Sequence, residues 1–116
     1  MLWQDLKSSY KIKLNIRDGE TIKMFCLKLE LKIKLFGLNS LKDKRSIVKN
    51  LTNRLRKKYN ISIIEGNFND SKNHLEIYIS SVSKNKDYLL DLIEQIEQDI
   101  ELMFGLEVEG EDYIIF

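Results

Sequence analysis

The sequence predicts an α+β fold in which four antiparallel strands form one sheet and two helices cover one of its faces. Three long segments alternate apolar and polar residues, as half-buried strands do. Two other segments repeat apolar residues at helical spacing. Together with one short apolar run, they follow the order strand, helix, strand, strand, helix, strand. This order is typical of the ferredoxin-like β-α-β-β-α-β sandwich.

The first half of the predicted fold comprises a strand, a helix and a short strand. Residues 26–35 (CLKLELKIKL) alternate Leu or Ile with Lys or Glu, and Gly37 breaks the pattern. Ser40 is a favourable helix N-cap, and Asp43 three residues later resembles a capping box. Residues 61–65 (ISIIE) predict the short strand. The helix between them has an apolar face formed by Leu41, Val48, Leu51, Leu55 and Tyr59, with Ile47 at its edge.

The second half of the predicted fold comprises a loop, a strand, a helix and a last strand. Residues 66–73 (GNFNDSKN) are rich in turn formers. Alternation continues through residues 75–79, and Asn85 can cap the second helix. Gly105 is a natural C-terminal stop for that helix, and residues 106–116 predict the last strand. The apolar positions of the second helix are Leu89, Leu92, Ile93, Ile96, Ile100, Met103 and Phe104.

Length and composition point to one globular domain in a reducing compartment. The chain has 116 residues, of which 43% are hydrophobic and 32% are charged. Cys26 is the single cysteine, so the chain cannot form an internal disulfide, and we expect a cytoplasmic protein. The apolar runs are shorter than a membrane span, and we expect no membrane partner.

We expect the ferredoxin-like domain to comprise residues 24–116 and residues 1–23 to be an extension. Residues 19–20 can be encoded by a purine-rich ribosome-binding sequence at a suitable distance from the Met24 codon, which indicates a later start. The rival interpretation is a short hairpin, because residues 10–16 alternate and lead into an Asp-Gly turn.

Charge is distributed unevenly along the chain, although the formal net charge is only +1. Residues 24–83 contain 12 Lys and Arg against 5 Asp and Glu, whereas residues 84–116 contain 2 against 10. Eight of the 12 cations in residues 24–83 lie on the first helix, at residues 40–59. Helical spacing places four of these cations in one stripe on its flank: Lys42, Arg45, Lys49 and Arg56. Four others are less well aligned with it: Lys44, Arg54, Lys57 and Lys58.

Three interpretations of this basic helix stay open. Its cations can simply solvate the helix, they can contact the phosphates of RNA, or they can face an acidic protein surface. Lys44 lies close to the apolar face, and we expect its ammonium group to reach solvent along the stem of the side chain.

The open face of the sheet is a weaker candidate for RNA binding. The predicted topology places the last strand beside the first, so that Glu107, Glu109 and Glu111 share a face with the lysines of the first strand. We expect cross-strand ion pairs there. Sheets that read RNA carry aromatic stacking residues, and this face offers Tyr78 alone.

Three motifs relate the chain to a known family: SLKDKR at residues 40–45, RLR at residues 54–56 and YNISIIE at residues 59–65. With these motifs the chain resembles the YlxP-like family of small bacterial proteins, whose function is unknown. The resemblance covers residues 24–116. The resemblance implies a ferredoxin-like fold, a cytosolic protein and no enzyme activity. Genes of this family often lie near those of translation initiation factor two and ribosome-binding factor A, which implies a ribosome- or RNA-related role. Many members have an Asp-Leu-Trp-Gln-like run where this chain has Asp-Ser-Lys-Asn at residues 70–73.

The sequence offers no convincing catalytic or metal site. One histidine, His74, and one cysteine cannot form a zinc site, and no glycine-rich phosphate loop is present. His74 beside Cys26 or a serine, and Glu65 beside Asp70, are formal candidates for nucleophilic or acid–base chemistry. We interpret them as surface and loop residues. We therefore expect no enzyme activity, no cofactor and no small-molecule substrate.

Two classes of function remain. The first is a non-catalytic accessory protein that binds the phosphate backbone of RNA, ribosomal RNA or the ribosome through the basic flank of helix 40–59. The second is a protein-interaction module or homodimer that uses an edge strand or the open sheet face and has no nucleic-acid role.

Overall fold

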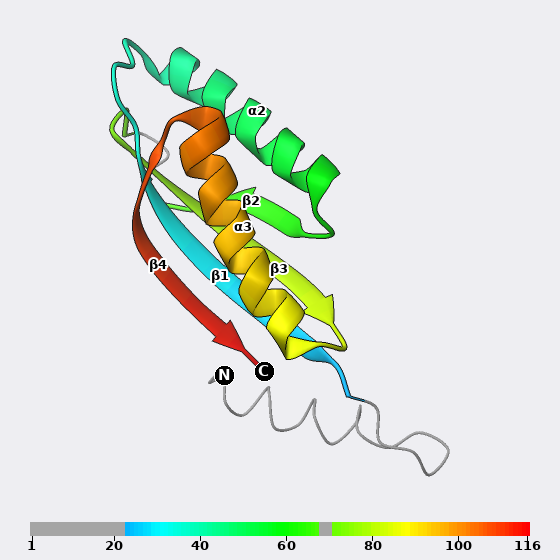
Figure 1. The fold of residues 1–116 in the computed structure, drawn as a ribbon. Helices are drawn as coiled ribbons and strands as arrows, with labels where there is room; N and C mark the ends of the chain where they lie inside the picture. The colour runs from blue at the N-terminus through cyan, green and yellow to red at the C-terminus, as the bar shows by residue number, and fades with distance from the viewer. Residues whose placement is uncertain (1–22, 68–70) are drawn as a thin grey trace.

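The fold is a single sheet with two helices on one side. A computed structural model describes residues 23–67 and 71–116 of the chain, and Figure 1 shows both helices on the same face of the sheet. The expected order of elements is confirmed. The elements are β1 (Phe25–Lys34), α2 (Leu41–Lys58), β2 (Ser62–Glu65), β3 (His74–Ser83), α3 (Lys86–Phe104) and β4 (Glu107–Ile115).

The strands lie in the order β2-β3-β1-β4, and each neighbouring pair is antiparallel. The two long central strands pair along their full length, from Phe25 opposite Ser83 to Lys34 opposite His74. The expectation that the last strand lies beside the first is confirmed, because β4 pairs with β1. β2 and β4 are therefore the two edges of the sheet, and they lie on opposite sides of the molecule.

The core lies between the sheet and the helices. Alternate residues of β1 are buried, namely Leu27, Leu29, Leu31 and Ile33, as period-two alternation predicts. β3 contributes Leu75, Ile77 and Ile79, and the helices contribute Val48, Leu51, Leu55, Leu89, Leu92, Ile93, Ile96 and Ile100. Full burial of each such side chain stabilises the fold by about 1.5–3 kcal/mol.

Local capping interactions mark the start of both helices and the end of α3. The Ser40 hydroxyl oxygen accepts a hydrogen bond from the backbone N–H of Asp43 at 3.1 Å, so the predicted cap is confirmed. The Asn85 side chain accepts bonds from two backbone N–H groups at the start of α3. Gly105 follows α3 with a φ of 65°, a left-handed conformation in which glycine is favoured.

A bulge in β4 overturns one expectation about its acidic residues. The register shifts between Lys32 and Ile33, so that Ile33 lies opposite Val108 while Lys32 lies opposite Gly110. The extra residue reverses the alternation that follows it. Glu111 consequently lies opposite the buried Leu31 and belongs to the helix-covered face. The prediction that it shares the open face with the lysines of β1 is therefore wrong.

Two further sequence expectations concern the rest of the chain. Within residues 23–67 and 71–116, no helix is both long enough and apolar enough to cross a membrane. The sequence left two alternatives for residues 1–23, a later start and a short hairpin. Of these residues, 1–22 lie outside the described part of the chain.

Candidate nucleic-acid interface

The basic stripe, as we call Lys42, Arg45 and Lys49 from here on, occupies one flank of α2. The three residues lie three and four positions apart, a spacing that aligns side chains along one side of a helix. All three are exposed. Among the residues that the structure describes, no ion pair involves any of them. The stripe therefore presents three uncompensated positive charges over about 10 Å of helix.

Arg56, the fourth predicted member, extends the stripe but has a second role. Its guanidinium donates to the Asn53 side-chain oxygen at 3.1 Å and to the backbone carbonyl of Ile63 at 3.2 Å. Ile63 belongs to β2, an edge strand. The guanidinium thus connects the end of α2 to β2. Because Arg56 is aligned with the basic stripe, the stripe lies on the side of α2 that faces the β2 edge of the sheet.

Lys44 differs from the expectation, because its side chain is buried and not exposed. Only 1% of the residue is accessible. The ammonium donates a hydrogen bond of 2.8 Å to the backbone carbonyl of His74, and it lies 3.8 Å from a carboxylate oxygen of Glu65. The side chain connects the first turns of α2 to the ends of β2 and β3. Lys44 therefore cannot contribute to a surface that touches RNA directly.

Arg54, Lys57 and Lys58 lie toward the other flank of α2, where they border α3. The Lys58 ammonium is 2.8 Å from the Asp99 carboxylate, which also accepts a 2.6 Å hydrogen bond from the Tyr59 hydroxyl. Partial burial alone would raise the pKa of Asp99, but these two hydrogen bonds lower it below its ordinary value. The hydrogen bond to Asp99 in turn raises the pKa of Lys58. This cluster clamps the end of α2 against α3.

A groove lies beside this clamp, between the last turns of the two helices. Its volume is about 270 Å³. Leu55, Met103 and Phe104 provide its apolar part, while Arg54, Lys57, Lys58 and Asp99 provide its polar part. We call it the α2–α3 groove. Helical spacing placed Met103 and Phe104 among the apolar positions of α3. In the structure 45% of Met103 is exposed, whereas Phe104 is half-buried against the core.

Acidic residues gather on the opposite side of the molecule. Burial, then a hydrogen bond with Glu111, raises the pKa of Glu97 on α3 to about 8, with Glu101 and Glu94 adding repulsion. Glu111 belongs to β4, the edge strand farthest from β2. Arg56 ties the basic flank of α2 to β2, and the acidic residues lie on α3 and β4, so the two groups are at opposite edges of the sheet. The unevenness of charge along the sequence is also an unevenness in space.

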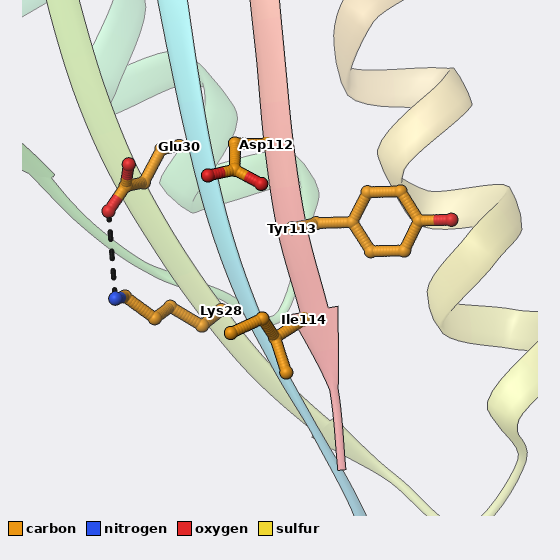
Figure 2. Close-up of a pocket in the computed structure, with 5 residues that line it drawn as sticks. All are labelled: Lys28, Glu30, Asp112, Tyr113 and Ile114. Atoms are coloured by element: carbon orange, nitrogen blue, oxygen red, sulfur yellow. Dashed lines mark ion pairs between the residues drawn. The ribbon is translucent and has the colours of Figure 1, made fainter. Parts of the chain in front are cut away.

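The open face of the sheet carries mixed charge. Figure 2 shows Lys28 and Glu30 on this face with Asp112 and Ile114 close by, whereas Tyr113 points to the opposite side, toward α3. The Lys28 ammonium lies 3.6 Å from Glu30. The hollow that these residues line has a volume of about 20 Å³, room for roughly one water molecule. A larger adjoining hollow, of about 260 Å³, is lined by four acids and one lysine: Glu30, Glu76, Glu111, Asp112 and Lys32. This part of the face therefore lacks the positive charge that an RNA site needs.

Tyr78, the aromatic residue expected on the open face, is already engaged. Its hydroxyl forms a hydrogen bond with Glu76, which raises the pKa of Tyr78. Its ring lies directly against Gly66, where any side chain would collide with it. The ring therefore covers the end of β2 and is poorly placed as a stacking platform.

Of the formal catalytic candidates, Cys26 and His74 lie far apart, whereas the Ser71 hydroxyl lies beside the backbone of His74 and accepts a hydrogen bond from its N–H at 3.2 Å. Cys26 lies opposite Val82, while His74 lies opposite Lys34 at the other end of the same strand pair, about 26 Å away. His74 Nδ1 instead lies 3.3 Å from the Glu109 carboxylate. Within residues 23–67 and 71–116, no group of three or more His, Cys, Asp or Glu side chains is placed to hold a metal ion.

The other formal candidate for acid–base chemistry is the carboxylate pair of Glu65 and Asp70. Glu65 lies beside the ammonium of Lys44, and Asp70 is outside the described residues.

Comparisons with known proteins relate the chain to a solved structure and to a protein family. Among solved structures, the chain is similar to the de novo designed protein Foldit4, with 11% sequence identity, a TM-score of 0.44 and coverage of 81% of this chain and 97% of that one. No curated protein matches the sequence. Residues 26–112 match a protein family over most of the chain. The chain therefore belongs to the family described as "Protein of unknown function (DUF503)".

Proposed function

We propose that this protein is a non-catalytic accessory factor that binds the phosphate backbone of structured RNA through the basic stripe. The observation that supports this most directly is the state of Lys42, Arg45 and Lys49. They are exposed, aligned on one flank of α2 and, among the described residues, free of ion pairs. Solvation of a helix does not require alignment of its cations, whereas contact with a phosphate backbone does.

The proposed contact is to phosphates and not to base edges. Lys and Arg attract phosphates by charge, and their contacts orient a protein on a nucleic acid without reading its sequence. The outermost side chains of α2 between its two basic flanks are short and uncharged: Ser46, Asn50 and Asn53 are all exposed. Asp43 in the first turn is the one acidic residue of α2, so RNA can approach the later turns of the helix closely without meeting an acidic side chain.

Two associations give further support to the proposal. The resemblance to YlxP-like proteins, whose genes often lie near those of translation factors, makes ribosomal RNA the first candidate partner and the cytoplasm the expected compartment. The segregation of charge to opposite edges of the sheet adds steering, because an asymmetric field orients a protein before contact.

A second candidate function is self-association through β4. This nine-residue strand forms an edge of the sheet, and its Tyr113 and Ile114 are 43% and 41% exposed. Edge strands with apolar residues can pair with another chain. However, Glu111 and Asp112 adjoin these residues, and antiparallel pairing of two copies would bring like charges together. We therefore rank a homodimer below RNA binding.

Charge reversal of the stripe tests the proposed function. We expect the triple variant Lys42→Glu, Arg45→Glu, Lys49→Glu to bind duplex RNA about 100-fold more weakly than the wild type at low salt. Each lost phosphate contact should lower the slope of log affinity against log salt by about one unit. Fluorescence anisotropy with RNA hairpins and cosedimentation with ribosomal subunits, both across a salt series, measure the effect. Arg56 is left unchanged because it also holds β2.

The matched control is Lys23→Glu, Lys84→Glu, Lys86→Glu. These residues are exposed and lie near the opposite end of the sheet, beside Ser83 and Phe25. The control changes the net charge by the same amount, so it should lower affinity only slightly. If both triple variants weaken binding equally, net charge alone is responsible. If the wild type shows no salt-dependent binding to RNA or ribosomes, the proposal is wrong.

A further inference from the structure

We propose that the α2–α3 groove receives one unpaired nucleotide of the RNA whose phosphates the basic stripe contacts. This inference rests on the proposed function and adds a structural preference to it. The protein would favour RNA in which a base leaves the stack, such as a bulge, over an uninterrupted duplex.

The apolar part of the groove suits a base. Leu55 forms a buried floor, and Met103 and Phe104 form a wall that is partly open to solvent. The Arg54 guanidinium carbon lies 5.4 Å from the centroid of the Phe104 ring. Unpaired bases stack on aromatic rings and on guanidinium planes in RNA-binding proteins. A base could therefore contact the Arg54–Phe104 pair along the open side of the groove.

The polar part of the groove suits the phosphates on either side of that base. Arg54, Lys57 and Lys58 provide three cations. Asp99 is the one acid in the lining, and it accepts hydrogen bonds from Lys58 and from Tyr59. The groove thus combines an apolar interior with a positive rim, which is the combination found where single-stranded nucleic acid binds.

The length of the groove argues against an acidic amphipathic helix as its occupant. From Arg54 to Lys58 the wall rises about 6 Å along α2. A docked helix places apolar anchors at positions i, i+4 and i+7 and needs about 10 Å of groove. A single nucleotide needs only one stacking position with phosphate contacts at its sides.

The stripe and the groove can belong to one binding surface. They lie on the two flanks of α2, and the exposed, uncharged side chains of Ser46, Asn50 and Asn53 lie between them. A strand that crosses the helix can contact the stripe with one phosphate segment and place the next nucleotide in the groove.

Three RNA hairpins, each closed by a non-nucleotide linker so that no loop base is unpaired, test the inference with the full-length protein. The first is fully paired, the second contains one bulged 2-aminopurine, and the third has an abasic site at the bulge. We expect the bulged base to raise affinity about 5- to 150-fold over the abasic hairpin, the usual range for stacking of one base. We also expect 2-aminopurine fluorescence to fall on binding, because stacking quenches it.

The variant for this test is Arg54→Lys, Phe104→Leu, which keeps charge and apolar volume but removes both planar groups. It should lose the preference for the bulged base and keep the affinity and salt slope for the paired hairpin. Thermal melting checks its fold, and the fluorescence of the wild-type complex gives a readout that needs no variant.

The outcomes separate this inference from the proposed function. If the paired hairpin binds and the bulged base adds nothing, the groove inference fails and the proposed function stands. Binding to none of the hairpins overturns both. A bulge preference that survives in the variant also overturns the inference, because it then reflects backbone flexibility. Chemical-shift changes confined to the groove with a Glu-rich amphipathic peptide, without such changes for bulged RNA, assign the groove to a protein partner instead.

Discussion

Lys44→Ala should lower the free energy of unfolding by about 2–4 kcal/mol. The side chain is 1% exposed, and its ammonium reaches the His74 carbonyl and the Glu65 carboxylate. Truncation leaves a cavity around the lost stem and removes the cation that faces Glu65. Loss of one partner from a buried ion pair is strongly destabilising, because the remaining charge is left without compensation. Part of the Glu65 side chain is in contact with solvent, which places the expected effect below the upper end of the range for such pairs.

Chemical denaturation followed by circular dichroism measures this effect. Lys42→Ala is the matched control, because Lys42 is an exposed lysine in the same turn of α2 and its loss should change stability by less than about 0.5 kcal/mol. Lys44→Met, which keeps the apolar stem, should be intermediate. Adding Glu65→Gln to Lys44→Met should recover stability, since the unpaired charge is then gone. Equal stability of Lys44→Ala and Lys42→Ala would contradict the burial of Lys44.

Glu97→Gln should stabilise the protein by about 1–2 kcal/mol at pH 9 and change its stability little at pH 5. Burial and the nearby Glu111 raise the pKa of Glu97 from its ordinary value of 4.5 to about 8 in the folded protein. The folded state therefore binds more protons than the unfolded state between these values. By linkage, this group makes its full contribution to stability below pH 4.5 and loses it as pH rises through 8. The expected gain in stability is small because the Glu97 side chain is only partly buried and solvent screens its repulsion by neighbouring acids.

Denaturation midpoints between pH 5 and pH 9 test this prediction. Wild-type stability should fall across the range, and Glu97→Gln should flatten that fall. Asp91→Asn is the matched control, because it removes one exposed acid from the same helix without touching the Glu97–Glu111 pair. If the midpoint falls with pH equally in the wild type and in Glu97→Gln, the pKa of Glu97 is not raised by Glu111 and burial, and the prediction is wrong.

Much of the fold could be predicted because its signals are local. Ser40, Asn85 and Gly105 stand at the helix termini where capping chemistry places them. Period-two alternation in β1 predicted its buried face correctly. These features depend on a few neighbouring residues, so the printed sequence contains all the information that they require.

The register of β4 depends on a contact with a distant strand, and it could not be predicted in the same way. Glu107, Glu109 and Glu111 alternate in the sequence as if they shared one face. A bulge before Gly110 moves Glu111 to the other face. A glycine inside a strand is a known sign of a bulge, and Gly110 was the available signal.

The candidate site was only partly predictable for a related reason. Helical spacing placed Lys42, Arg45 and Lys49 on one flank, and the structure places them there. Spacing also put Lys44 near the apolar side. Whether its ammonium turned to solvent or inward depended on the Glu65 and His74 groups that only the tertiary fold brings close. The α2–α3 groove likewise depends on where α3 ends relative to α2.

The guanidinium of Arg56 has a consequence for how copies of this protein behave when crowded. The carbonyl of Ile63 is an acceptor at the outer edge of the sheet, and Arg56 already occupies it. A foreign strand that tried to extend the sheet at β2 would have to displace a charged donor and then lie beside further positive side chains. The sheet is therefore protected from fibril-like growth on this side. The hydrogen bond from Arg56 does not depend on net repulsion, so this protection persists when high salt screens the surrounding charge.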